Sequence, residues 1–144
     1  MYNLSMIVKQ VHLLFLEQLV KDSHPFESCA ILLGKRDKDK FFVYEIMPTQ
    51  NKESSGIRFT IDEDRLFEIY KLADKKNLSV IGIFHSHPSL PYPSQTDKIY
   101  MKINPVPWII KSTTTNEMRC FMSDEGQGID NDTKIEEIKI KVKD

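Results

Sequence analysis

Apolar residues divide the chain into short segments whose spacing predicts strands and helices in alternation. Runs of strand length occupy residues 4–8, 28–34, 41–47, 80–84, 108–114 and 118–122, and the spacing at 138–142 is also strand-like. Apolar residues recur at helical spacing over residues 10–22, 62–76 and 97–103. The pattern predicts one α+β domain over residues 1–144, with an α-β-α layered arrangement around a mixed sheet.

Two of the predicted helices carry an apolar stripe, which we expect to face the core. The stripe residues are Val11, Leu14, Phe15 and Leu19 in the first helix, and Leu66, Phe67, Tyr70 and Ala73 in the second. The segment at 28–34 is almost entirely apolar, which predicts a central strand buried on both faces. Pro48 is expected to end the strand at 41–47.

Composition narrows the class of protein without naming a function. Hydrophobic residues make up 40% and charged residues 28% of the 144 residues, which is typical of a soluble globular domain. A formal net charge of −1 gives no electrostatic reason to expect nucleic acid or an anionic membrane as a partner. Cys29 and Cys120 both fall in apolar runs and form no CxxC pair, so we expect free buried thiols and a cytoplasmic setting.

The stretch that carries the chemistry follows the apolar run at 80–84. His85 and His87 are one residue apart, so on a strand their side chains lie on the same face. A proline-rich loop then leads to Asp97 in the first turn of the next predicted helix. Two imidazoles and a carboxylate are a set of three zinc ligands that leaves the fourth position to water, as in catalytic zinc sites.

Such a site also needs a base, and Glu27 is the candidate. It stands at the start of the central strand, where a carboxylate is costly unless a partner such as a metal-bound water compensates it. Each residue has an ordinary alternative when it is taken alone. Glu27 could mark a strand start at the surface, and Ser94 and Asp97 also fit a helix capping box. Taken together, the residues favour a metal site.

These residues resemble a known motif. The run His85-Ser86-His87-Pro88 with Ser94-Gln95-Thr96-Asp97 resembles the JAMM motif of the MPN+ (JAB1/MPN/Mov34) metalloproteases, and residues 25–34 resemble the segment that carries their catalytic glutamate. The resemblance implies a single Zn²⁺ per chain, with a catalytic water, bound by His85, His87 and Asp97. It implies Glu27 as general acid and base and Ser94 as oxyanion donor. It also implies an MPN-like domain with a curved mixed sheet flanked by helices, similar in architecture to cytidine deaminases.

The reaction that the resemblance implies is hydrolysis of the amide or isopeptide bond after the C-terminal glycine of a ubiquitin-like or sulfur-carrier protein. The compact chain is similar to archaeal and bacterial members, whose partners are such modifiers and their conjugates; a homodimer is left open. An extended modifier tail would suit addition to a sheet edge. The candidate edge is the substrate-binding segment Ile57, Arg58 and Phe59.

The chain departs from the family pattern in two places. The spacing between His87 and Asp97 is one residue shorter than is common, which assigns the deletion to the loop 89–93, and Ala30 stands where a glycine is usual. Two alternatives share part of the motif, namely a RadC-like protein and a metal-free MPN scaffold that only binds. A zinc deaminase is excluded because its Pro-Cys-x-x-Cys pair is missing.

Overall fold

The structure is a computed structural model that describes residues 3–49, 62–123 and 134–144. In these residues seven strands and three helices follow one another along the chain. The strands are β1 (Ser5–Val8), β2 (Cys29–Asp37), β3 (Lys40–Thr49), β4 (Ser79–His87), β5 (Trp108–Ser112), β6 (Met118–Ser123) and β7 (Ile135–Val142). The helices are α1 (Gln10–Ser23), α2 (Glu63–Lys75) and α3 (Gln95–Ile103).

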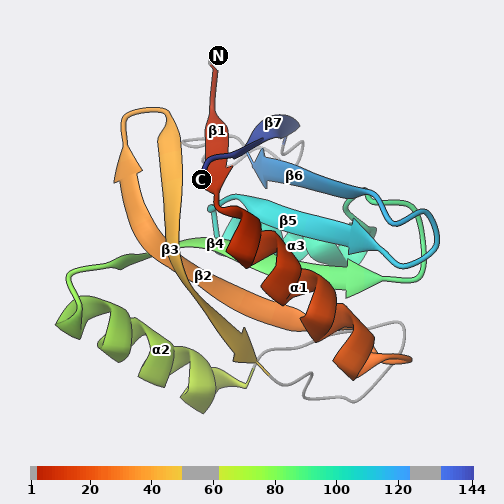
Figure 1. The fold of residues 1–144 in the computed structure, drawn as a ribbon, viewed down its shortest axis with the longest axis horizontal. Coiled ribbons are helices and arrows are strands. Elements are labelled where there is room, and N and C mark those ends of the chain that lie inside the picture. The colour runs from red at the N-terminus through yellow and green to blue at the C-terminus, as the bar shows by residue number, and fades with distance from the viewer. Residues whose placement is uncertain (1–2, 50–61, 124–133) are drawn as a thin grey trace.

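The strands form one mixed sheet that closes on itself. Their order is β1-β3-β2-β4-β5-β6-β7, and β7 returns to pair in parallel with β1 (Figure 1). β2 is antiparallel to both of its neighbours, β3 and β4, while β4 and β5 run parallel. The predicted α+β class and mixed sheet are therefore confirmed. The closure into a barrel was not predicted, because it depends on the pairing of the first strand with the last.

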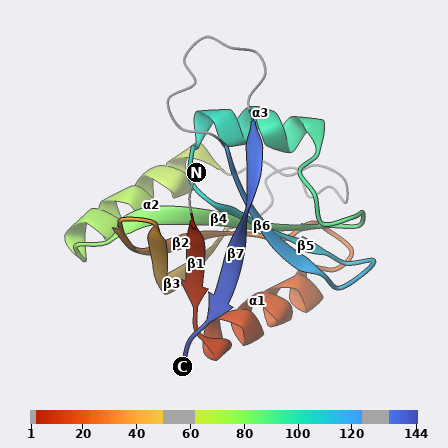
Figure 2. The same ribbon diagram turned by 90° about the horizontal axis from the view of Figure 1, so that it is seen from above.

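Hydrophobic side chains pack on both faces of this sheet. Successive residues of a strand point to opposite faces, and in β2 Ala30 belongs to one core cluster while Ile31 belongs to the other. The first cluster includes Leu16 of α1, and the second includes Ile69 of α2 and Met101 of α3. Figure 2 accordingly shows α2 and α3 on one side of the strands and α1 on the other. β2 and β4 run through the middle of both clusters.

The predicted inward face of α1 is wrong for Val11, Leu14 and Phe15, whereas Leu19 packs against the core as predicted. Val11 is 64%, Leu14 57% and Phe15 43% exposed, whereas Leu16 is 1% and His12 8% exposed. The helix is apolar on most of its circumference, so periodicity alone did not identify its buried side. The buried side of the helix was not recognised because it includes the polar residue His12. The Nδ1 of His12 accepts a hydrogen bond of 3.0 Å from the Lys9 N–H.

Two further predictions need correction. In α2 the buried residues are Ile69 and Ala73, whereas Phe67 is 64% and Tyr70 48% exposed, so half of the predicted inward stripe is at the surface. β3 continues through Pro48, which pairs with Ala30 of β2. Proline is tolerated there because β1, the other neighbour of β3, pairs only with its first residues, Lys40, Phe41 and Phe42.

Candidate active site

The end of β4 places both histidines in a buried position beside β5. His85 is 1% and His87 5% exposed, and their ring centroids lie 5.3 Å apart. Trp108 of β5 packs edge-on against His85, with 6.0 Å between ring centroids. β4 reaches this point because it is an apolar strand between two partners, β2 and β5. The alternation of the strand therefore delivers two imidazoles to one side of the sheet.

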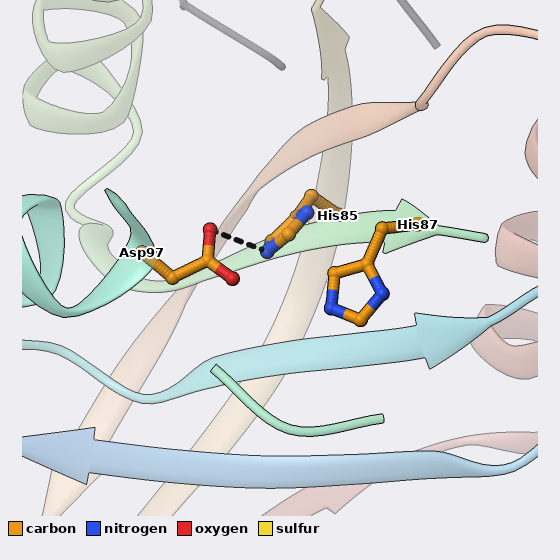
Figure 3. Close-up of side chains that lie close together, drawn as sticks. All are labelled: His85, His87 and Asp97. Atoms are coloured by element: carbon orange, nitrogen blue, oxygen red, sulfur yellow. Dashed lines mark ion pairs between the residues drawn. The ribbon is translucent and has the colours of Figure 1, made fainter. Parts of the chain in front are cut away.

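Asp97 reaches the same place from the first turn of α3. Its Oδ2 accepts a hydrogen bond of 2.9 Å from the Ser94 N–H, and its Oδ1 lies 3.2 Å from Nε2 of His85 (Figure 3). Asp97 therefore belongs to the capping box and also faces the histidines. Burial acts to raise the pKa of Asp97, but the hydrogen bond and charge of His85 and the hydrogen bonds from Ser94 outweigh it and hold that pKa below its usual value.

The side chains of His85, His87 and Asp97 suit a zinc ion. One ligand atom from each lies within 4.8 Å of the other two, and all three residues are buried. Two ligands of a tetrahedral zinc are about 3.4 Å apart when each bond is about 2.0–2.1 Å long. The separation of 3.2 Å between His85 Nε2 and Asp97 Oδ1 is close to that value. Nitrogen and oxygen donors of this kind are those that zinc accepts.

His87 is held by the loop that follows β4. The Ser89 Oγ lies 2.8 Å from His87 Nδ1, and the Tyr92 carbonyl oxygen lies 3.3 Å from Nε2. Burial, together with the charge of His85, lowers the pKa of His87, which favours the neutral imidazole that metals bind. The Tyr92 ring packs against Phe121 at 5.8 Å between centroids, so the short loop has its own anchor on β6.

Glu27 lies in the segment just before β2, at the edge of the three-residue cluster. It is 7% exposed, and its Oε1 is 3.8 Å from Nδ1 of His85. Burial raises the pKa of Glu27 to about 7; the charge of His85 opposes this shift and that of Asp97 adds to it. Glu27 and His85 are thus far apart in sequence but close together in the structure.

The remaining predicted residues have different outcomes. Ser94 is exposed, and its Oγ accepts the Asp97 N–H at 3.0 Å as the N-cap of α3. A hydroxyl that accepts in this way can still donate its own hydrogen. Ile57, Arg58 and Phe59, the predicted substrate edge, lie outside the described residues.

Sequence reasoning did not single out Ser89, Tyr92 or Trp108. Ser89 and Tyr92 contact His87, and Trp108 contacts His85. The position of Ser89, two residues beyond His87, is a signal that could have suggested it as a partner for that ring. Trp108 has no such signal, because its place beside His85 follows from the register of β4 with β5. Within the described residues, no helix has both the length and the apolar character that crossing a membrane requires.

Comparison with known proteins finds a matching family model and two named relatives. Residues 9–124 match the family model of prokaryotic homologues of the JAB domain. A desampylase from Pyrococcus furiosus is 30% identical over 142 residues, which span 98% of this chain and 94% of that protein. An AMSH-like protease, sst2, from Schizosaccharomyces pombe is 36% identical over 63 residues, or 44% of this chain and 14% of that protein.

The fold is also shared with a solved structure. The solution structure of a protein from Desulfitobacterium hafniense superposes with a TM-score of 0.81, covering 96% of this chain and 93% of that one. Sequence identity over the superposition is 24%, so this similarity concerns the fold alone.

Proposed function

The chain belongs to the family of prokaryotic JAB-domain homologues within the JAMM/MPN+ proteins, and from this we propose that it is a zinc-dependent isopeptidase. The proposed reaction is hydrolysis of the amide or isopeptide bond that follows the C-terminal glycine of a ubiquitin-like or sulfur-carrier protein. The observation that carries the proposal is the gathering of His85, His87 and Asp97 at the buried end of β4, with Glu27 beside them.

His85, His87 and Asp97 are the residues that would hold the zinc. When bound, zinc supplies a Lewis acid that polarises a carbonyl group and lowers the pKa of water toward about 7. The donor set supports this assignment, because two imidazoles and one carboxylate leave an open position of the kind catalytic zinc sites keep.

Glu27 and Ser94 would carry out the proton transfer and the charge stabilisation. Hydrolysis breaks the C–N bond, places the water oxygen on the carbonyl carbon and delivers a proton to the leaving nitrogen. In our proposal the Glu27 carboxylate accepts a proton from the attacking water and later donates it to the leaving amine. The Ser94 hydroxyl, which still has its own hydrogen to give, donates to the carbonyl oxygen as negative charge develops there.

The substrate class rests on the relatives. One of them is named a desampylase and another an AMSH-like protease, which supports a protein modifier and its conjugates as the substrate.

The proposal treats residues 1–144 as one domain. It places the activity in the cytoplasm on account of two free cysteines, Cys29 and Cys120, which are both buried.

A cleavage assay tests the proposal and its non-enzymatic alternative together. Purified protein is mixed with ubiquitin-like fusions and lysine conjugates, first as prepared, then after removal of metal by a chelator, and finally after zinc is restored. We expect cleavage after the terminal glycine that the chelator abolishes and zinc restores. Cleavage that is insensitive to the chelator would refute the metalloprotease. Failure to bind zinc would favour a binding scaffold, which lacks catalysis.

A further inference from the structure

Two serines connect the segment of Glu27 with the strand that carries the histidines. Ser28 is 3% and Ser86 1% exposed, and their Oγ atoms lie 2.8 Å apart. The Ser28 N–H donates to the Ser86 Oγ at 3.0 Å, and the Ser86 N–H donates to the Ser28 carbonyl oxygen at 3.0 Å. Three short contacts thus join residue 28 to residue 86 in a fully buried place.

The contact between Ser28 and the Ser86 hydroxyl differs from regular sheet pairing. β2 pairs with β4 from Cys29 opposite His85, and the same antiparallel register places Ser28 opposite Ser86. In a regular hydrogen-bonded pair the two residues exchange both N–H···O=C bonds. Here the Ser86 side-chain oxygen accepts the Ser28 N–H. A hydroxyl therefore extends the pairing by one residue, to Ser28, which precedes the first residue of β2.

That extra residue is the one next to Glu27. Glu27 itself lies outside the helices and strands, between α1 and β2. On its N-terminal side, the Phe26 N–H donates to the Ser23 carbonyl oxygen at 2.8 Å, which ties the segment back to the end of α1. On its C-terminal side the tie is Ser28 to Ser86, and Ser86 stands between the two histidines in sequence. The Ser86 hydroxyl, together with the bond from the Ser86 N–H to the Ser28 carbonyl oxygen, therefore ties the backbone next to Glu27 to the histidine pair.

We propose that Ser86 is a positioning residue: its hydroxyl, through the Ser28 N–H, holds the Glu27 carboxylate at its place beside His85. This inference rests on the proposed function, since it takes Glu27 as the group that moves the proton. The Ser86 side chain points away from the histidines, because Ser86 lies between His85 and His87 in β4 and successive residues of a strand face opposite sides of the sheet. Ser86 therefore acts through the backbone and does not touch the substrate.

Two variants of equal size separate this role from ordinary packing. Ser86→Ala removes the acceptor of the Ser28 N–H, whereas Ser28→Ala removes the partner hydroxyl and keeps that N–H bond. We expect Ser86→Ala to lower kcat on the order of 10- to 100-fold, as misplacement of a catalytic group does, while KM and zinc affinity stay within about 3-fold. Ser28→Ala should stay within about 3-fold in kcat as well, and Ser86→Thr, which keeps the hydroxyl, should restore most of the rate.

Amide hydrogen exchange on the zinc-free protein gives a readout that does not need activity. The Ser28 amide should exchange at least about 10-fold faster in Ser86→Ala than in the unaltered protein, because an unpaired N–H loses its protection. Amides elsewhere in β4 should change less. If Ser86→Ala does not fold, Ser86→Cys carries the same test, since sulfur fills the space and is a weak acceptor.

The outcomes are distinct. A zinc-loaded Ser86→Ala protein with unchanged kcat, or an unchanged exchange rate of the Ser28 amide, would overturn the positioning role. A loss of stability with full kcat per zinc-loaded molecule would mean that the pair only supports packing, and would overturn it too. If the unaltered protein cleaves no modifier substrate, the proposed function fails, and the exchange rate still decides whether Ser86 holds the Ser28 segment.

Discussion

Ser94 has two roles in this account, helix cap and oxyanion donor, and substitutions can separate them. As N-cap of α3 its Oγ accepts the Asp97 N–H at 3.0 Å. As oxyanion donor it uses the hydrogen of the same hydroxyl. Glycine is an acceptable N-cap but has no hydroxyl, alanine is a poor N-cap without a hydroxyl, and threonine keeps both functions.

The loss of stability on substitution follows from the cap, and the loss of cleavage rate follows from the oxyanion donor. Replacing a serine cap by alanine costs about 1 kcal/mol, and by glycine only a few tenths. For a domain of this size 1 kcal/mol lowers the melting temperature by about 3–4 °C. Removing one oxyanion donor lowers kcat about 10²- to 10³-fold. We therefore expect kcat to fall by the same factor in Ser94→Gly and Ser94→Ala, although only Ser94→Ala should have a clearly lower melting temperature. Ser94→Thr should keep both the cleavage rate and the melting temperature.

Thermal melts and steady-state kinetics on the three zinc-loaded variants test this expectation. Because residue 94 keeps its backbone N–H in every variant, the bond to Asp97 Oδ2 remains available and zinc affinity should change little. If Ser94→Gly cleaves as fast as the unaltered protein, Ser94 is only a cap and the oxyanion role is wrong. If activity follows the melting temperature instead, the loss comes from α3 and not from the hydroxyl.

Three further predictions concern His12, Ser89 and the two cysteines. Burial lowers the pKa of His12, so His12 takes up its proton at lower pH in the folded state than in the unfolded chain, and stability is lost as pH falls below about 6.5. His12→Gln keeps an acceptor for the Lys9 N–H and should make the melting temperature depend less on pH between pH 7.5 and 5.5. An unchanged dependence of melting temperature on pH would contradict this. Ser89→Ala removes the hydroxyl 2.8 Å from His87 Nδ1 and should weaken zinc binding about 10-fold in a chelator competition, whereas equal affinity would rule out that support. Burial raises the pKa of Cys29 to about 11 and raises that of Cys120, so iodoacetamide at pH 8 should label neither thiol until the protein is unfolded. Rapid labelling of the native protein would contradict this expectation.

Much of the fold and the gathering of His85, His87 and Asp97 could be predicted from sequence because the signals are local. The apolar run before His85 and the one-residue spacing to His87 are enough to place two imidazoles on one face of a strand. The cap of α3 at Ser94 is likewise a local pattern, and the structure contains both of its hydrogen bonds. The resemblance to the MPN+ family, which rests on these residues, is confirmed by the family model that matches residues 9–124.

The features that sequence did not predict depend on contacts between distant segments. The buried side of α1 is decided by the barrel beneath it, which selects Leu16 and His12 over the equally periodic Val11 and Phe15. The contact of Ser28 with Ser86 requires the register of β2 with β4, and nothing local in either run of residues specifies that register. Closure of the sheet likewise joins β1 to β7 across almost the whole chain.

The central claim is that Glu27 makes the cluster of His85, His87 and Asp97 a hydrolytic site. Its most direct test is the zinc content and the cleavage rate of Glu27→Gln beside Glu17→Gln, a matched change on the exposed side of α1. We predict that both variants bind as much zinc as the unaltered protein, that Glu17→Gln keeps its cleavage rate, and that Glu27→Gln loses at least about 10²-fold. A zinc-loaded Glu27→Gln protein that retains most of the rate would contradict the account.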